Sequence, residues 1–385
     1  MHSEETSGHR LDCIRKRRNL LKNFFRLRGM EPKEGFDCIG YAAHDESGFL
    51  KPFKFKRRNS GPDDVVFRVT HCGICYAEVI WTRNFLSDVQ YPVVPGHEIV
   101  GVVTKVGSNV SNFKVGERVG VGYCAMSCLH CDSCKEGMDS MCVNLATRVF
   151  NAVDVDGTIT RGGFSNIMQA HQRFVVKIPD ALPSDVAAPL LCAGATVYGP
   201  MKRLGMNKPG MKLGVVGLGG VGHMGVLFGK AFGLHVTVFS TSSSKKDEAL
   251  GVLGADAFVL SKDEEAMKAQ HNTLDFIINA ASGSIPLDPY LLALKQEGVL
   301  VLVGAGAEAK FSPHNVFMRK FITGSAGGGG AKNVQEMLDF AAEKRVFPLI
   351  ETINIDYVNE AMNRLVQNDV RYRFVIDIEN SLKPE

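Results

Sequence analysis

Residues 213–232 read LGVVGLGGVGHMGVLFGKAF and give the strongest indication of the fold. The first four residues are apolar and favour a buried strand, whereas residues 223–232 are typical of a helix. Between them, residues 217–222 form the pattern G-x-G-x-x-G, in which glycines allow a tight turn and let the backbone approach a pyrophosphate. The helix that follows would present amide donors to that anion. We therefore predict a dinucleotide-binding turn, with a plain glycine turn as the alternative.

The second predicted strand indicates which dinucleotide is bound. An acidic residue about twenty positions beyond the glycines would bind the ribose 2′-hydroxyl of NAD. That position is Ser240, at the end of a strand predicted over residues 236–240, and two lysines follow it. Hydroxyl groups and cations suit a 2′-phosphate, so we predict NADP(H) rather than NAD; an ordinary solvated turn is the alternative. The predicted cofactor-binding residues here are Gly217, Leu218, Gly219, Gly220, Val221, Gly222, Ser240, Thr241, Ser242, Lys245 and Lys246.

Strands and helices alternate through the segment 193–330, which predicts a parallel sheet with helices on both faces. A helix is predicted over residues 245–253. Further apolar strand candidates lie at 257–260, 276–278 and 298–303.

The segments on either side of that alternation are β-rich. Residues 37–121 contain short Val- and Ile-rich runs separated by Gly, Asn and Pro turns, which is typical of strands. The end of the chain returns to this style after a helix predicted over 333–343. The fold class predicted from these patterns is α/β, with a nucleotide-binding domain at 193–330 inserted into a catalytic domain made of 30–192 and 331–385.

Four cysteines in a C-x2-C-x2-C-x7-C spacing predict a metal site within residues 124–142. Two-residue gaps let thiolates converge on one ion, and four sulfurs complete the tetrahedron of a structural zinc site. An iron–sulfur cluster and unpaired thiols are the alternatives; the long final gap and the lack of a following proline favour zinc. The four ligands would be Cys128, Cys131, Cys134 and Cys142.

Composition limits the remaining possibilities. The chain has 385 residues, 45% of them hydrophobic and 22% charged, with a net charge of +3. We expect no membrane span, because no run of 18 apolar residues is free of charge. Ten cysteines without a disulfide-like framework indicate a reducing compartment, and we predict the cytoplasm. Residues 1–29 form a basic head, which we predict to be a disordered and dispensable extension.

From Met30 onward the chain resembles the zinc-dependent medium-chain alcohol dehydrogenases, and among them the plant cinnamyl alcohol dehydrogenase group. This resemblance implies a GroES-like catalytic domain, a Rossmann dinucleotide-binding domain and a homodimer. Besides the four-cysteine segment, the matching stretches are residues 72–75, 91–101, 114–119, 189–194, 214–220, 254–256 and 370–377.

The resemblance also implies a catalytic zinc site. Taken singly, His97 reads as a core histidine and Cys192 as a buried thiol, but in the family these positions bind zinc with Cys75. Glu98 would be a fourth or exchangeable ligand. Three protein ligands leave one position for the substrate oxygen, where zinc acts as a Lewis acid. Thr196 would contact the cofactor. The implied cofactors are NADP(H) with one catalytic and one structural zinc ion.

The chain departs from its relatives directly after Cys75. Relatives carry a hydroxyl residue two positions later and a histidine five positions later, which pass the alcohol proton to solvent. Here these positions are Ala77 and Ile80, so that relay is absent. Either Tyr76 or ordered water takes the proton, or hydride goes to a conjugated C=C or an iminium carbon instead.

Three nearby features bear on the same site. Glu78 replaces an aspartate that supports a ligand from behind in the family. Trp81 falls where relatives line the substrate pocket, although core packing is an equal reading. Residues 324–330, GSAGGGG, replace bulkier side chains, which suggests a roomier or more mobile site near the nicotinamide.

We therefore expect a zinc-dependent oxidoreductase that acts on a bulky aldehyde or alcohol with NADP(H). A reductase of a conjugated C=C or an iminium, as in alkaloid and terpenoid metabolism, is the alternative. A non-enzymatic scaffold that binds dinucleotide or nucleic acid is a third hypothesis. Retention of every apparent zinc ligand argues against it, and we expect neither nucleic acid nor membrane as a partner.

Overall fold

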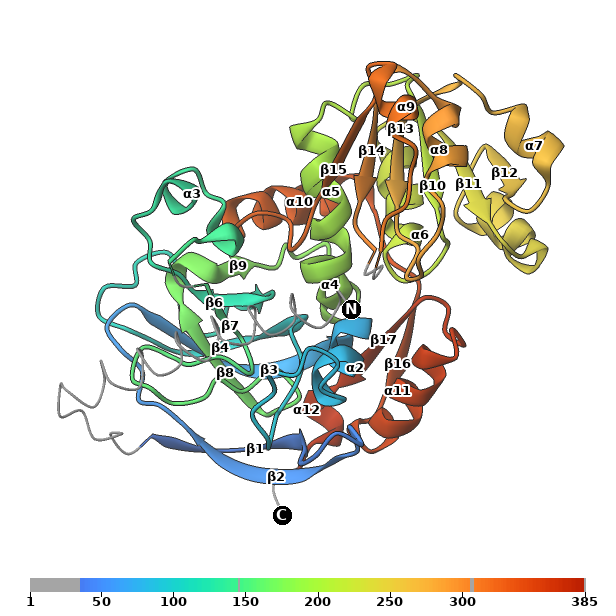
Figure 1. Cartoon of the computed structure of the whole chain (residues 1–385). Helices are drawn as coiled ribbons and strands as arrows, with labels where there is room; N and C mark the ends of the chain where they lie inside the picture. Colours follow the sequence, from blue (N-terminus) through green and yellow to red (C-terminus); the bar gives the residue numbers. More distant parts are fainter. Residues whose placement is uncertain (1–34, 145, 305–307, 384–385) are drawn as a thin grey trace, which may run out of the picture.

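Six parallel strands form one sheet of the structure, a computed structural model that describes residues 35–144, 146–304 and 308–383 (Figure 1). Their order is β12-β11-β10-β13-β14-β15. The chain adds β11 and β12 on one side of β10 and then adds β13, β14 and β15 on the other side, so the strand order reverses between β10 and β13. This is the strand order of dinucleotide-binding sheets, which bind ligands at the carboxyl ends of strands near the reversal. The strands are β10 (Lys212–Val216), β11 (His235–Ser240), β12 (Ala257–Leu260), β13 (Leu274–Asn279), β14 (Leu294–Leu302) and β15 (Phe321–Gly324).

Apolar residues on both faces of this sheet explain why it is buried. Leu213 and Val215 point to one face of β10 and Ile277 lies in β13 beside it, and all three are fully buried. Parallel strands are covered by their crossover helices and therefore read as continuous apolar runs. The covering α-helices are α5 (Ala195–Arg203), α6 (Gly222–Ala231), α7 (Glu264–Lys268), α8 (Asp288–Ala293) and α9 (Pro313–Phe317).

The helix predicted over 245–253 differs from a regular α-helix. The segment begins as a 3-10 turn at Ser243–Lys245 and continues as a π-helical turn at Glu248–Val252. The wide turn is closed by the amide of Leu253, which donates to the carbonyl of Glu248 at 3.0 Å. Short π turns inside helices often occur at functional sites.

A second, largely antiparallel sheet brings the two ends of the described chain together. Its order is β16-β17-β3-β4-β5-β9, with β8 also paired to β3. Because β17 pairs with β3, the C-terminal strand and an early strand share one sheet. The strands are β3 (Asp64–Ile74), β4 (Ile99–Val106), β5 (Arg118–Val121), β8 (Ile167–His171), β9 (Val175–Lys177), β16 (Ile350–Ile353) and β17 (Arg373–Asp377).

Smaller elements cover this sheet or connect it to the parallel one. Helix α10 (Ala331–Lys344) runs from the end of β15 back to α5 and β9. The remaining elements are the hairpin β1 (Phe36–Ala43)–β2 (Leu50–Arg57), the pair β6 (Cys124–Met126)–β7 (Thr147–Arg148), and the helices α2 (Tyr76–Thr82), α3 (Asp132–Lys135), α4 (Ser184–Pro189), α11 (Val358–Val366) and α12 (Ile378–Ser381).

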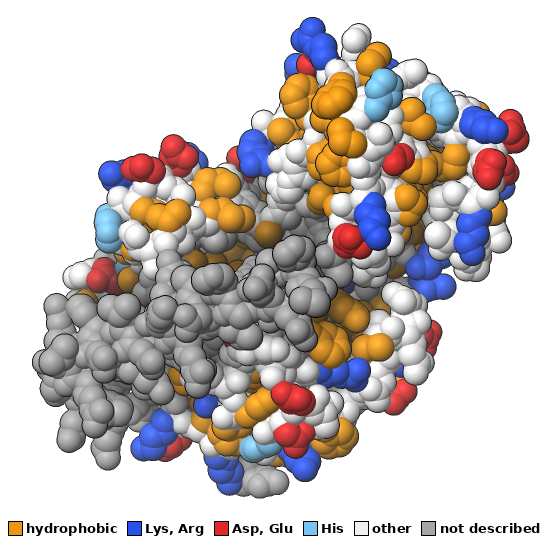
Figure 2. All heavy atoms as spheres, in the orientation of Figure 1, with side chains coloured by type: hydrophobic (Ala, Val, Ile, Leu, Met, Phe, Trp, Pro, Cys, Tyr) orange, Lys and Arg blue, Asp and Glu red, His pale blue; other side chains and the backbone are white. Residues whose placement is uncertain are grey.

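One buried cluster of apolar side chains crosses from one sheet to the other. It contains Val100 of β4 and Val215 of β10, and between them the residues of α4 and α5 such as Ala187 and Val197. Because this core is continuous, it does not mark a boundary between two domains, and the predicted domain limits stay a prediction. The predicted extension 1–29 lies outside the described residues. Within the residues described, none of the helices is long and apolar enough to cross a membrane. Figure 2 shows hydrophobic side chains on the surface of the upper lobe, near α9.

Phe67, in the centre of β3, is fully buried between β4 and β8. We expect Phe67→Ala to lower the free energy of unfolding by about 3–5 kcal/mol, because it removes a large apolar side chain and leaves a cavity. Val115→Ala is the control, since Val115 is 66% exposed, and it should change stability by less than about 0.5 kcal/mol. Urea unfolding followed by circular dichroism measures both, and equal stabilities would contradict this account of the core.

Candidate active site and zinc sites

The structure brings together the four residues that the family resemblance implies for catalytic zinc. Cys75 caps α2 at the end of β3, His97 and Glu98 immediately precede β4, and Cys192 lies in a π-helical turn, Leu190–Gly194, between α4 and α5. One ligand atom of each lies within 4.8 Å of the others. The Sγ atom of Cys192 is 3.1 Å from Nε2 of His97. Two thiols, an imidazole and a carboxylate are a donor set that suits Zn²⁺.

Glu78 orients this group from behind, as the sequence predicted. One of its carboxylate oxygens lies 2.5 Å from Nδ1 of His97, and the other accepts the backbone N–H of Cys75 at 2.8 Å. Glu78 is fully buried. Burial alone would lower the pKa of His97, but the charge of Glu78 and the nearby Cys75 raise it well above the usual value. A carboxylate on Nδ1 directs Nε2 toward a metal, which is a common arrangement in zinc proteins.

Burial and hydrogen bonding also change the acidity of the two cysteines. A hydrogen bond with Cys192, helped by the charges of Arg373 and His97, holds the pKa of Cys75 well below its usual value despite burial. The same hydrogen bond and burial raise the pKa of Cys192. Both thiols could coordinate a cation as thiolates.

Arg373 is a residue of this site that the sequence analysis did not single out. It lies in β17, is 3% exposed, and forms a buried ion pair with Glu98. Burial raises the pKa of Glu98 to about 7 against the opposing charge of Arg373. A Cβ atom on Gly220 would come within 2.8 Å of the guanidinium, so Arg373 also touches the glycine turn. The available signal was a charged residue at the start of the apolar strand RFVID.

The glycine turn has the geometry that the sequence predicted. Gly217 has a φ of +83°, which a side chain would strain, and a Cβ on Gly222 would lie 1.8 Å from the carbonyl oxygen of Gly217. Lys245 reaches back to this turn, because its Nζ donates to the carbonyl of Leu218 at 2.7 Å. Ser240 ends β11 at the same edge of the sheet.

The other predicted cofactor residues lie in the turn or in neighbouring elements. Gly219 and Val221 lie within the turn, Thr196 is nearly buried in α5, and Thr241, Ser242 and Lys246 are exposed beyond β11. Ser242 accepts the amide of Ser244 through its hydroxyl. Their roles in binding the cofactor stay predictions.

Aromatic side chains line the zinc-ligand group. The Tyr123 ring meets the His97 ring edge to face at 6.0 Å, and Phe150 lies 6.3 Å from it. Trp81 is 6% exposed, packs edge to face on Phe150, and is covered by the guanidinium of Arg148 at 4.1 Å. Of the two readings of Trp81, the structure favours core packing over contact with substrate.

The start of α2 contains no replacement for the missing relay apart from Tyr76. This tyrosine directly follows Cys75 and is 37% exposed. Ala77 and Ile80 are partly buried and offer no titratable group. Which group handles the alcohol proton therefore stays a prediction.

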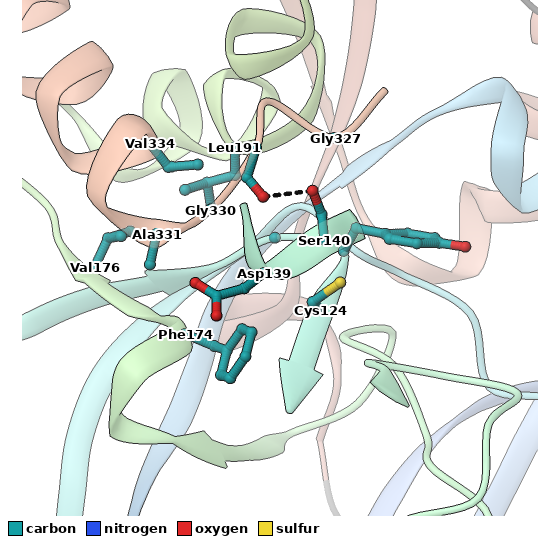
Figure 3. Close-up of a pocket in the computed structure, with 13 residues that line it drawn as sticks. Cys124, Asp139, Ser140, Phe174, Val176, Leu191, Gly327, Gly330, Ala331 and Val334 are labelled. Atoms are coloured by element: carbon teal, nitrogen blue, oxygen red, sulfur yellow. Dashed lines mark hydrogen bonds between the residues drawn. The ribbon is translucent and has the colours of Figure 1, made fainter. Parts of the chain in front are cut away.

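The glycine run at 324–330 lies against the cysteine segment. Gly327, Gly328 and Gly329 all have positive φ, and the hydroxyl of Ser140 donates to the carbonyl of Gly329 (Figure 3). A cavity of about 450 Å³ opens beside the run, with Met138, Tyr198 and Ala326 in its wall. A smaller one of about 40 Å³ lies under Ser140. Neither a zinc ligand nor a residue of the glycine turn lines the larger cavity, so the roomier site near the nicotinamide stays a prediction.

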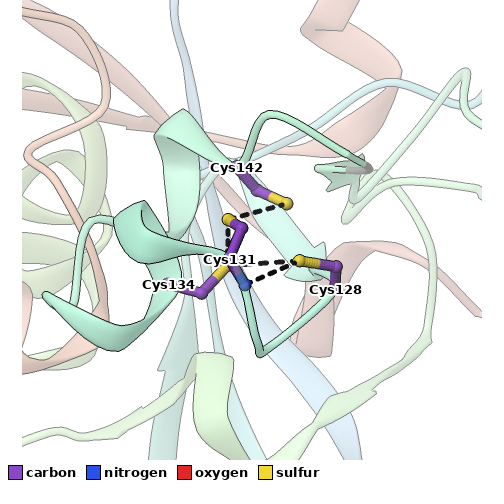
Figure 4. A group of neighbouring side chains, drawn as sticks. All are labelled: Cys128, Cys131, Cys134 and Cys142. Atoms are coloured by element: carbon purple, nitrogen blue, oxygen red, sulfur yellow. Dashed lines mark hydrogen bonds between the residues drawn. The ribbon is translucent and has the colours of Figure 1, made fainter.

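The four cysteines of the predicted structural site converge around one point (Figure 4). The sulfur of Cys134 lies 3.5 Å from that of Cys131 and 3.9 Å from that of Cys128, and Cys131 and Cys142 are 3.9 Å apart. Zinc–sulfur bonds of about 2.3 Å in a tetrahedron place sulfurs roughly 3.8 Å apart, which agrees with these distances. Several irons and sulfides need a wider space between thiolates, so the geometry favours a single zinc ion.

Known families match both parts of the chain. Residues 61–180 match the family described as alcohol dehydrogenase GroES-like domain, and residues 220–343 match the family described as zinc-binding dehydrogenase. Fold and site together define a zinc-binding dehydrogenase with a GroES-like domain and a Rossmann sheet. This confirms the predicted fold class.

Individual relatives narrow the family further. A probable cinnamyl alcohol dehydrogenase 1 of Oryza sativa subsp. japonica is 54% identical over 90% of this chain and 98% of its own. The 8-hydroxygeraniol dehydrogenase of Catharanthus roseus is 51% identical over 90% of this chain and 96% of its own. The chain belongs to the cinnamyl alcohol dehydrogenase family, as the sequence resemblance indicated.

Solved structures agree with this assignment. A cinnamyl alcohol dehydrogenase from Sorghum bicolor has a TM-score of 0.88 at 48% identity and covers 91% of this chain and 100% of its own. The enzyme CAD from Helicobacter pylori, solved with NADP(H), has a TM-score of 0.83 at 32% identity and covers 90% of this chain and 99% of its own.

We expect Cys131→Ser to remove about one zinc ion per chain, because a serine oxygen is a poor replacement for a thiolate in an all-sulfur site. Cys124→Ser is the matched control, since Cys124 is a buried thiol of the same segment that lies outside both metal-ligand groups. Elemental analysis of the purified proteins gives the zinc content. Unchanged zinc in Cys131→Ser would contradict the assignment of the four-cysteine site.

Proposed function

We propose that this protein catalyses hydride transfer between NADP(H) and a bulky aldehyde or alcohol. The observation that carries the proposal is the convergence of Cys75, His97, Glu98 and Cys192 beside the glycine turn, with Arg373 touching both. The similarity to cinnamyl alcohol dehydrogenases supports the same reaction. Zinc would supply Lewis acidity to a carbonyl oxygen, and the nicotinamide would supply the hydride.

The protein groups have separate roles in this proposal. Cys75, His97 and Cys192 would hold the metal, while Glu78 keeps Nε2 of His97 directed toward it. Glu98 would exchange between the metal and Arg373, because one of its oxygens pairs with the guanidinium and the other has no partner among the described residues. Tyr123 and Phe150 would exclude water from the reacting carbon. Tyr76 is the nearest candidate on α2 for handling a proton.

A second candidate reaction is reduction of a conjugated C=C or an iminium. It is favoured by one specific observation, which is that Ala77 and Ile80 provide no path for the proton of an alcohol. We favour the first reaction, because a relative that is 51% identical is named 8-hydroxygeraniol dehydrogenase, and that name describes an enzyme that acts on an alcohol. We propose a cytoplasmic protein, since none of the nine cysteines of the described residues is in a disulfide.

Deuterium transfer distinguishes the two reactions. The protein with its full zinc content is incubated with NADPH deuterated at the nicotinamide C4 and a panel of aldehydes, enals and cyclic iminium ions. We expect deuterium at the carbonyl carbon of an aldehyde, because that carbon would face the nicotinamide. Deuterium at a β-carbon or an iminium carbon, read by NMR, would replace the first proposal with the second. His97→Ala, which removes a proposed metal ligand, should abolish both.

We also propose that two copies form a homodimer through the open edge of the parallel sheet. Strand β15 is the last strand of that sheet, and exposed side chains surround it, with Phe317 77%, Met318 53% and Phe321 51% exposed. Phe317 ends α9, Met318 follows it, and Phe321 begins β15. Exposed apolar groups beside an unpaired strand edge are typical of a surface that pairs with another chain.

We expect Phe321→Lys to shift the protein from dimer to monomer, because a charge would be buried at the paired edges. Size-exclusion chromatography with light scattering gives the mass. Val115→Lys is a control at an exposed apolar position away from this edge. A wild-type monomer, or a Phe321→Lys variant that stays dimeric, would refute an interface at β15.

A further inference from the structure

Where the chain enters β17, three residues contact the glycine turn or the segments that follow the predicted cofactor residues: Arg371, Tyr372 and Arg373. Arg373 touches Gly220 of the glycine turn. The ring of Tyr372 stacks on His223, the residue that follows the last glycine, with centroids 4.8 Å apart. The hydroxyl of Tyr372 donates to Glu248 at 2.7 Å. The segment therefore runs along the cofactor edge of the parallel sheet although it belongs to the other sheet.

Arg371 lies beside the predicted 2′-phosphate turn. Its Nε is 3.1 Å from a carboxylate oxygen of Glu248, and Glu248 follows Lys245 by three positions. The pKa of Lys245 is lowered mainly by burial and also by the positive charge of Arg371. Two cations from different parts of the chain are thus close enough to repel one another, and the carboxylate of Glu248 pairs with one of them.

This arrangement has the charge that a phosphate monoester needs. Lys245 is partly buried and donates to the backbone carbonyl of Leu218, so it has no carboxylate of its own among the contacts of the described residues. The guanidinium of Arg371 keeps its remaining N–H groups available, because the side chain is 46% exposed and Glu248 binds Nε. An arginine fork recognises a phosphate through two parallel hydrogen bonds, which a lysine cannot form.

We propose that Arg371 is a further residue that binds the 2′-phosphate of NADP(H), together with Lys245, and so determines the preference over NAD(H). This inference rests on the proposed function, because it requires NADP(H) as the cofactor. Glu248 would hold Arg371 at the turn when no cofactor is present and would share it with the phosphate afterwards. The phosphate would then contact both the parallel sheet and the segment that carries Arg373.

The test is cofactor binding, which does not depend on turnover. Dissociation constants for NADPH and NADH are measured by the fluorescence of the reduced nicotinamide in wild type and Arg371→Gln. We expect Arg371→Gln to weaken NADPH binding about 10-fold, since it removes a charge-assisted contact at a half-exposed position. NADH binding should change less than about 2-fold, because NADH lacks the 2′-phosphate and keeps the pyrophosphate.

Two further variants separate phosphate binding from a merely structural role. Glu248→Gln removes the competing carboxylate, so NADPH should bind equally well or more tightly, whereas a role of the ion pair in holding the sheets together predicts weaker binding. Arg68→Gln is the matched control, because Arg68 is 45% exposed and paired with Glu379 far from the turn.

Each outcome has a distinct meaning. Equal weakening of NADPH and NADH by Arg371→Gln would overturn the proposal and assign Arg371 to the pyrophosphate or to the contact between the sheets. Unchanged NADPH binding in Arg371→Gln, with a clear NADPH preference in wild type, would overturn this inference alone. A wild type that does not prefer NADPH would instead contradict the cofactor of the proposed function.

Discussion

The buried ion pair between Arg373 and Glu98 joins three parts of the chain that are distant in sequence. Arg373 comes from the last strand, Glu98 from the residues before β4, and the guanidinium also touches the glycine turn at Gly220. A buried pair is stable only when its geometry is good, and removing one partner typically costs about 3–5 kcal/mol. Zinc ligands, glycine turn and C-terminal strand therefore depend on one another for their positions.

The metal-ligand group is also held together by hydrogen bonds between neighbouring segments. Glu78 fixes His97 and the amide of Cys75 at the same time, so the first turn of α2 and the residues before β4 are held in register. The absence of a side chain at Gly73 leaves room for the carboxylate of Glu98, since a Cβ there would lie 2.0 Å from its oxygen. The glycine at position 73 is therefore needed for Glu98 to fit into this site.

Much of this could be predicted from sequence, for a physical reason. The glycine turn and the four-cysteine segment are local, so spacing alone specifies which backbone amides and thiolates meet. Cys75, His97 and Cys192 are far apart in the chain, and only the family resemblance indicated that they meet. Arg373 was not predicted as a site residue, because one charged residue at the start of an apolar strand does not form a recognisable sequence motif. Its partners come from two other segments of the chain. The helix at 245–253 was only partly predicted, because the apolar pattern of the sequence does not distinguish a π turn from an α-helical one.

The continuous apolar core described above has a consequence for how this protein can be taken apart. The predicted boundary at 192/193 falls inside the run of helices, α4 to α5, whose Ala187, Val197 and Met201 pack into that core from both sides. Cutting the chain there would expose apolar surface on each fragment, and neither sheet would keep its full cover. The two lobes are therefore joined by packed helices rather than by a bare linker. A movement of one lobe against the other would have to rearrange the packing of α4 and α5.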